Sequence, residues 1–190
     1  MYFHGSKTGG IELLEPRISN HGIPMIYFSD KRENVLVYLS NAVEKFCREN
    51  DFAYDGVWTK WGSYGFDSSG ILVLEEYYPN AFSETYSGVS GYIYFKEKLD
   101  FTQDNIGIKG ALTVSECVKP DGCEFVPDAY KEILRASEKG LIKLVKYEQH
   151  NADKLKWIEK TILNEYGDEN IKPDYKFFLE NKFPFVTYDR

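Results

Sequence analysis

Short apolar runs, rich in β-branched and aromatic residues and bounded by turn residues, recur along the chain and predict a series of strands. The runs at 56–61 and 70–78 are joined by the Gly- and Ser-containing segment 62–70, which predicts a hairpin. The predicted strands are residues 1–4, 23–29, 56–61, 70–78, 90–95, 112–118 and 141–148.

Apolar residues at helical spacing predict several helices. The clearest covers residues 30–50, where Asp30 is placed to cap the first turn. The apolar face of that helix consists of Val35, Leu39, Ala42, Val43 and Phe46, and its polar face of Lys31, Asn41, Glu44, Lys45 and Arg48. The other predicted helices are residues 79–86, 127–140, 151–167 and 172–184.

Strands and helices follow one another without regular βαβ alternation, which favours the α+β class with a mostly antiparallel, split or curved sheet. No internal repeat and no low-complexity linker interrupts the pattern. We therefore predict one domain over residues 1–150, with a C-terminal helical extension, 151–190, packed on the same domain.

The composition is that of a globular chain, and the net charge limits the classes of partner that we expect it to bind. The 190 residues are 43% apolar and 16% aromatic. The net charge of -7 and the lack of a Lys/Arg stripe argue against duplex nucleic acid. Three cysteines without a C-x-x-C pair indicate reduced thiols and no metal site. Without a signal peptide or a membrane-length apolar run, we expect a cytoplasmic protein that does not contact a membrane.

Candidate chemistry begins with His4, Gly5 and Ser6 at the end of the first predicted strand. Tyr27 lies near the end of a buried strand, and Tyr38 follows eleven residues later. One tyrosine on a strand and one on a helix, in this relation, can face each other across a flat ring. The alternatives are an ordinary strand end for His4 and core packing for the two tyrosines.

These motifs resemble the ADP-ribosyltransferase superfamily, and most of all its diphtheria-toxin and poly(ADP-ribose) polymerase branch. The resemblance rests on H-G-S after the first strand and on I-Y-F-x-D followed by a Tyr. It is also similar to small bacterial proteins with an H-G-S … L-x-P-R-I-S … H-G … V-Y-A-T arrangement. The match covers roughly the first 40 residues. It implies a split, mostly antiparallel sheet with flanking helices, and NAD as the substrate.

The resemblance also implies a role for each of these residues. His4 would bond a ribose hydroxyl of NAD, and the backbone of Gly5 would hold the nicotinamide carboxamide, with Ser6 adding a hydroxyl. Tyr27 and Tyr38 would sandwich the nicotinamide ring. Bound nicotinamide is a cationic pyridinium, and aromatic faces attract cations and stack on flat rings.

The third element of the family is a glutamate at the start of a late strand. Alignment with the segment 110–120 places Leu112 at that position. Within the family, an apolar residue there goes with transfer of a single ADP-ribose or with lost activity. Glu116 lies on the same face of the predicted strand but about 13 Å further along. Glu75 and Glu76, at another strand end, are alternative carboxylates.

The leading hypothesis is an NAD-binding protein that transfers one ADP-ribose and releases nicotinamide. Its predicted catalytic residues are His4, Tyr27 and Glu116, with Leu112 lining the pocket and Arg17 as a donor to the diphosphate. The acceptor is a protein side chain, a nucleic acid end or a small molecule. The alternatives are a catalytically degenerate nucleotide-binding or interaction module on the same fold, or a related RNA 2′-phosphotransferase. The acidic net charge argues against the last.

Overall fold

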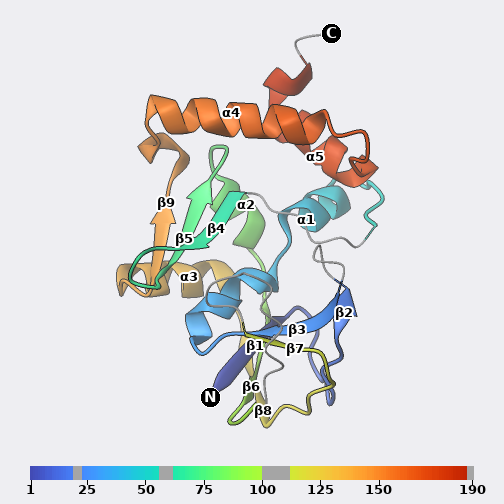
Figure 1. Cartoon of the computed structure of the whole chain (residues 1–190), viewed down its shortest axis with the longest axis vertical. Coiled ribbons are helices and arrows are strands. Elements are labelled where there is room, and N and C mark those ends of the chain that lie inside the picture. The colour runs from blue at the N-terminus through green and yellow to red at the C-terminus, as the bar shows by residue number, and fades with distance from the viewer. Residues whose placement is uncertain (19–22, 56–61, 100–111, 188–190) are drawn as a thin grey trace. The chain divides into compact units, whose positions relative to one another are not determined.

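The computed structural model describes residues 1–18, 23–55, 62–99 and 112–187, which form an α+β structure with three small sheets (Figure 1). The predicted α+β class is thus confirmed. The predicted strand at 56–61 lies outside the described residues. The strands are β1 (Tyr2–Ser6), β2 (Arg17–Ile18), β3 (Pro24–Phe28), β4 (Gly62–Phe66), β5 (Leu72–Glu76), β6 (Gly91–Lys96), β7 (Leu112–Val114), β8 (Gly122–Val126) and β9 (Ile142–Val145).

The helices include both α-helical and 3-10 segments. The α-helices are α1 (Ala42–Glu49), α2 (Ala81–Tyr86), α3 (Ala129–Glu138), α4 (Ala152–Tyr166) and α5 (Pro173–Lys182). The 3-10 segments are η1 (Arg32–Leu39), η2 (Tyr147–Gln149) and η3 (Pro184–Thr187).

The first sheet has the order β1-β6-β8, with both strand pairs antiparallel (Figure 1). Its central strand places Tyr94 between His4 of β1 and Cys123 of β8. Ile93 and Tyr94 point to opposite faces because strand side chains alternate, and both are buried. This sheet is therefore covered on both sides at its centre.

The second sheet has the order β2-β3-β7, and it shares a core with the first. Tyr94 reaches that core from the first sheet, and its hydroxyl also fixes the loop after β1, accepting from Ile11 N and donating to Thr8 O, each at 3.0 Å. The buried cluster consists of Leu14, Ile26, Phe28, Tyr94, Val114 and Val118. The fold thus fixes β1 and β3 through one apolar core.

The third sheet has the order β4-β5-β9, and it shows that part of the predicted hairpin is wrong. The segment 62–70 was predicted to be the connection, but it contains the strand β4. The turn is shorter: Asp67 Oδ1 accepts from Ser69 N at 2.9 Å and from Ile71 N at 3.0 Å, and Gly70 adopts a φ of +76°. An Asp that bonds its own following backbone, before a Gly at positive φ, specifies a tight turn.

The single helix predicted over 30–50 is wrong, because the chain is extended at Ser40 and Asn41. Asn41 was placed on the polar face, but it is buried and caps α1, accepting from Val43 N at 3.0 Å and Glu44 N at 3.3 Å. Asp30, the predicted cap, is exposed, and η1 begins after Lys31 with no side-chain cap. The capping preference of the buried Asn41 thus starts a new helix at this point, although the apolar periodicity predicted one continuous helix.

The three predicted C-terminal helices are confirmed as α3, α4 and α5. Asp128 caps α3 by accepting from Lys131 N at 3.0 Å, and Asn151 caps α4 by accepting from Lys154 N at 2.9 Å. Pro173 stands in the first turn of α5, where its missing N–H costs nothing. These start signals are local, so the sequence predicts them well.

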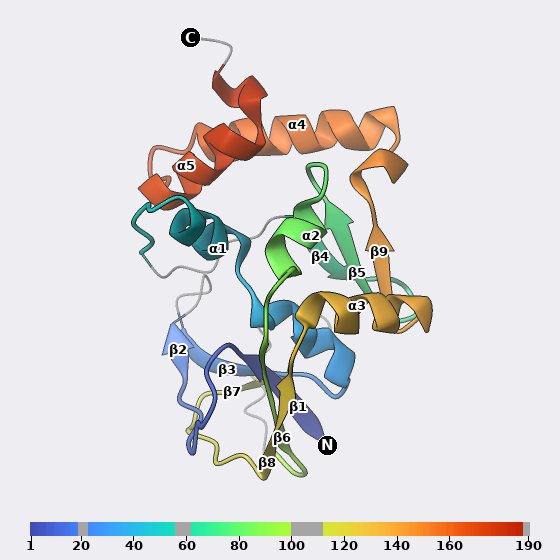
Figure 2. The same ribbon diagram turned by 180° about the vertical axis from the view of Figure 1, so that it is seen from behind.

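The chain forms two compact units. Unit 1 comprises Met1–Ser40, Tyr64–Val73 and Tyr86–Lys143, and unit 2 comprises Asn41–Ser63, Leu74–Thr85 and Leu144–Arg190. In unit 2, α5 contacts both α1 and α4 (Figure 2). The predicted boundary at residue 150 stays a prediction. No helix in the described part of the chain is long and apolar enough to cross a membrane.

Candidate functional site

His4 joins two of the predicted site segments within unit 1. Its imidazole lies half-buried on β1, with Nδ1 at 2.9 Å from the Tyr27 carbonyl oxygen of β3. The His4 ring also packs against Phe28, with ring centroids 5.7 Å apart. A carbonyl can only accept, so Nδ1 carries the proton and donates it. In the neutral ring Nε2 is then a hydrogen-bond acceptor.

The hydrogen bond from the His4 side chain takes the place of the next backbone hydrogen bond between β1 and β3. Phe3 exchanges backbone bonds with Ser29 at 2.8 and 2.9 Å, and this pair is an isolated bridge. N–H and C=O groups of an antiparallel strand point to alternate sides, so Gly5 points them to the same side as Phe3. Continued register would set Gly5 opposite Tyr27. The Tyr27 carbonyl instead accepts from the imidazole of His4.

The N–H and C=O of Gly5 are therefore directed to the side on which β1 and β3 separate. Gly5 also lies against η1. A Cβ added to Gly5 would lie 2.3 Å from the Val35 carbonyl oxygen and 3.4 Å from Tyr38 Cβ. Only a residue without a side chain permits this approach. The structure thus brings Gly5 beside Tyr38, as well as bringing His4 to Tyr27.

Tyr38 is accessible and yet surrounded by protein. It is 42% exposed, and the Tyr27 side chain is half-buried. Burial and the neighbouring Tyr27 both raise the pKa of Tyr38. Tyr38 thus offers an exposed aromatic surface beside Gly5.

Burial is also the main reason that the pKa of His4 is lowered; the bond to Tyr27 opposes the shift, and the positive charge of Arg17 adds to it. His4 is therefore neutral near pH 7. Arg17 itself is exposed on β2. Ser6 Oγ accepts from Thr8 N at 3.1 Å, and a hydroxyl that accepts one bond can still donate another.

We expect protonation of His4 to destabilise unit 1. Its folded pKa lies below the ordinary 6.5, so between these values the unfolded chain binds more protons than the folded one. The free energy of unfolding should then fall as the pH drops below about 6.5, and this contribution should be flat above it. His4→Gln should reduce the slope in urea unfolding between about pH 5 and 8. Equal slopes in the two proteins would contradict the assignment.

The late strand that was predicted to carry Leu112 and Glu116 is shorter than predicted. Leu112 begins β7 opposite Phe28, and its side chain packs against the shared core. Thr113 opposes Tyr27 and shares its face of the sheet. β7 ends at Val114, and Glu116 is exposed in the bend that follows, so the prediction of a strand reaching Glu116 is wrong. A catalytic role for Glu116 stays a prediction.

The two alternative carboxylates belong to unit 2 and are engaged there. Glu76 is buried and accepts from Lys146 Nζ at 3.3 Å and from two backbone N–H groups. Glu75 lies 2.8 Å from Lys154 Nζ. Both contribute to the structure of unit 2.

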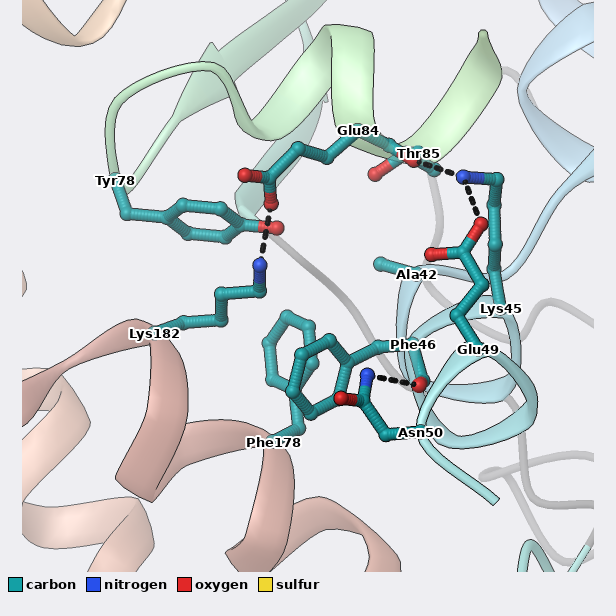
Figure 3. A pocket seen from close by; sticks show the side chains of 10 residues that line it. All are labelled: Ala42, Lys45, Phe46, Glu49, Asn50, Tyr78, Glu84, Thr85, Phe178 and Lys182. Atoms are coloured by element: carbon teal, nitrogen blue, oxygen red, sulfur yellow. Dashed lines mark hydrogen bonds and ion pairs between the residues drawn. The ribbon is translucent and has the colours of Figure 1, made fainter. Parts of the chain in front are cut away.

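A second site, which the sequence did not predict, lies within unit 2. A pocket of about 280 Å³ is lined by residues of α1, α5 and the segment from Tyr78 to Thr85 (Figure 3). The Lys182 ammonium lies 4.7 Å from the Phe46 ring centroid and 5.5 Å from that of Tyr78. It also lies 2.6 Å from the Glu84 carboxylate. We call Phe46, Tyr78 and Glu84 the ammonium cage.

No local motif signals this cage, because Phe46 lies far along the chain from Tyr78 and Glu84, and its occupant Lys182 lies farther still. Burial and the nearby Glu84 carboxylate raise the pKa of Tyr78, so its phenol stays protonated. Among the described residues, no group of three His, Cys, Asp or Glu side chains is arranged to hold a metal ion.

Comparisons with known proteins assign the chain to no family. No family model matches the chain, and neither a curated protein nor a solved structure matches it significantly.

Proposed function

We propose that the chain binds NAD in unit 1 and transfers a single ADP-ribose from it, with release of nicotinamide. The observation that carries the proposal is the hydrogen bond from His4 Nδ1 to the Tyr27 carbonyl. It joins two of the predicted segments, stands in place of a ladder bond and leaves the Gly5 backbone directed away from β6. The ADP-ribosyltransferase resemblance uses the same residues.

Each group has a role that its chemistry supports. His4 Nε2 accepts from a ribose hydroxyl, since the ring is neutral and Nδ1 is the donor. The Gly5 N–H and C=O form a donor–acceptor pair that matches the carboxamide of nicotinamide. Tyr27 and Tyr38 supply aromatic faces for its cationic ring. Arg17 supplies positive charge for the diphosphate.

Cleavage of the nicotinamide–ribose bond passes through an oxocarbenium-like state that an adjacent carboxylate stabilises. Leu112 at the expected glutamate position packs into the core and offers no such charge. This observation favours a second candidate function, a nucleotide-binding module without catalysis. Glu116 is the carboxylate that we propose for the active alternative.

An NAD titration followed by calorimetry tests the site. We expect Tyr27→Ala and Tyr38→Ala each to weaken binding about tenfold, because each removes one stacking face. Phe125→Ala is the matched control: this aromatic residue is exposed on β8 of the same unit, and its loss should leave the affinity unchanged.

Equal binding by all four proteins, or no binding by any of them, would refute the NAD site. Release of nicotinamide from bound NAD, measured over hours, then separates the two functions. Release that disappears in Glu116→Gln supports the transferase, and NAD binding without release supports the binding module.

A further inference from the structure

The Lys182 side chain occupies the ammonium cage in a way that resembles a bound ligand. Its charged end lies over the Phe46 and Tyr78 rings and forms an ion pair with Glu84 (Figure 3). Aromatic faces and a carboxylate around one nitrogen are the features by which proteins bind organic cations. A carboxylate at 2.6 Å requires an N–H donor, which a primary ammonium has and a quaternary one lacks.

The cage opens onto space that Lys182 does not fill. The pocket beside it, about 280 Å³, is walled by the rings of Phe46 and Phe178 and by Ala42. Pockets for drug-sized ligands begin near 300 Å³, so this one suits a smaller molecule with an apolar body. Asn50 lies at its rim, where its amide donates to the Phe46 carbonyl at 2.8 Å.

Lys182 is also placed so that it can leave. It is the last residue of α5, where the chain turns into Phe183, and helix ends fray first. The Glu84 side chain is 44% exposed, so solvent and solutes reach the carboxylate. The Lys182 side chain is 19% exposed, so the ion pair is partly buried, and opening it costs less than opening a fully buried pair. Lys182 also lines a neighbouring groove of about 420 Å³ toward which it can move.

The second lysine of the pocket does not compete for the cage. Lys45 Nζ donates to the backbone carbonyl of Glu84 at 2.7 Å and pairs with Glu49 at 2.8 Å. It thus holds the segment that carries Glu84 in place without neutralising the Glu84 carboxylate. The geometry points to a binding site for a small primary alkylammonium ion in the cage of Phe46, Tyr78 and Glu84, with Lys182 as the internal occupant that the ligand displaces.

The test is a titration of the full chain with n-propylammonium, which matches the lysine side chain beyond Cβ. We expect weak, saturable binding by the wild type, followed by chemical-shift changes at the ring protons of Phe46 and Tyr78. Lys182→Ala should bind about tenfold more tightly, because a tethered competitor at millimolar effective concentration is gone. Tetramethylammonium should bind both proteins more weakly, and the neutral isostere 1-propanol should not bind.

Two further variants, made in the Lys182→Ala background, keep the test specific. Glu84→Gln should abolish binding by removing the negative charge, and it preserves the shape of the side chain. Glu49→Gln, a change of the same kind on the rim of the same pocket, should leave the affinity unchanged. The proposal is overturned if Lys182→Ala shows no saturable binding, if Glu84→Gln binds as well as its parent, or if only Lys182→Ala binds and the wild type does not.

Discussion

Replacing Gly5 by alanine should lower the free energy of unfolding of unit 1 by about 3 kcal/mol, the upper end of what overpacking costs. The added Cβ would lie 2.3 Å from the Val35 carbonyl oxygen, well inside van der Waals contact. That oxygen is backbone, so it moves only if η1 shifts. At this chain length the loss corresponds to a drop in Tm of roughly 6–12 °C, measurable by calorimetry.

Gly65→Ala is the matched control. Gly65 is also a strand glycine of unit 1, but a Cβ added there meets nothing within 4 Å. It should leave stability unchanged or raise it slightly by restricting the unfolded chain. A loss below about 1 kcal/mol in Gly5→Ala would show that η1 yields easily. The close approach of Gly5 to Tyr38 would then not be a fixed feature of the site.

Glu76→Ala should have a comparable or larger effect in unit 2, about 3–5 kcal/mol. The Glu76 side chain is 1% exposed, and its carboxylate accepts from Phe82 N at 2.9 Å, from Tyr147 N at 3.1 Å and from Lys146 Nζ. Removing it leaves two backbone N–H groups without their acceptor and one ammonium without its counter-charge. Urea unfolding monitored by circular dichroism measures the loss.

Two neighbouring changes show whether the network, rather than the helix or strand, is responsible. Glu76→Gln keeps one acceptor oxygen and should cost less than half as much as alanine. Glu75→Ala removes a partly exposed partner of Lys154 and should cost within about 1 kcal/mol. Equal losses for Glu75→Ala and Glu76→Ala would contradict the importance that we give to the buried carboxylate.

The elements that the sequence predicts well are those whose start is encoded locally. α4 has an Asn151 cap and buried residues Ile158 and Ile162 at helical spacing, and it begins where predicted. β8 is absent from the predicted strands, since Cys123, Glu124 and Phe125 are all exposed and give no apolar alternation. Pairing with β6 holds that strand in place, and a partner so far away in the sequence leaves no local signal.

In the candidate site, too, some features are visible in the sequence and others depend on tertiary structure. The spacing of Tyr27 and Tyr38 and the Gly after His4 are visible in the sequence, and the structure brings these residues near one another. The bond from the imidazole to a strand carbonyl is not visible, because it depends on where the ladder between β1 and β3 stops. The ammonium cage depends entirely on tertiary packing of residues from separate helices and one turn.

The composition of unit 2 from three separate stretches of chain has a consequence during synthesis. Asn41–Ser63 and Leu74–Thr85 leave the ribosome before Leu144–Arg190, the stretch that carries α4 and α5. At about 5–20 residues per second, α2 waits roughly 3–12 s and α1 roughly 5–19 s before the first residue of that stretch is made. The face of α1 that α5 contacts is uncovered during this interval, and exposed apolar surface of this kind makes incomplete chains prone to aggregation.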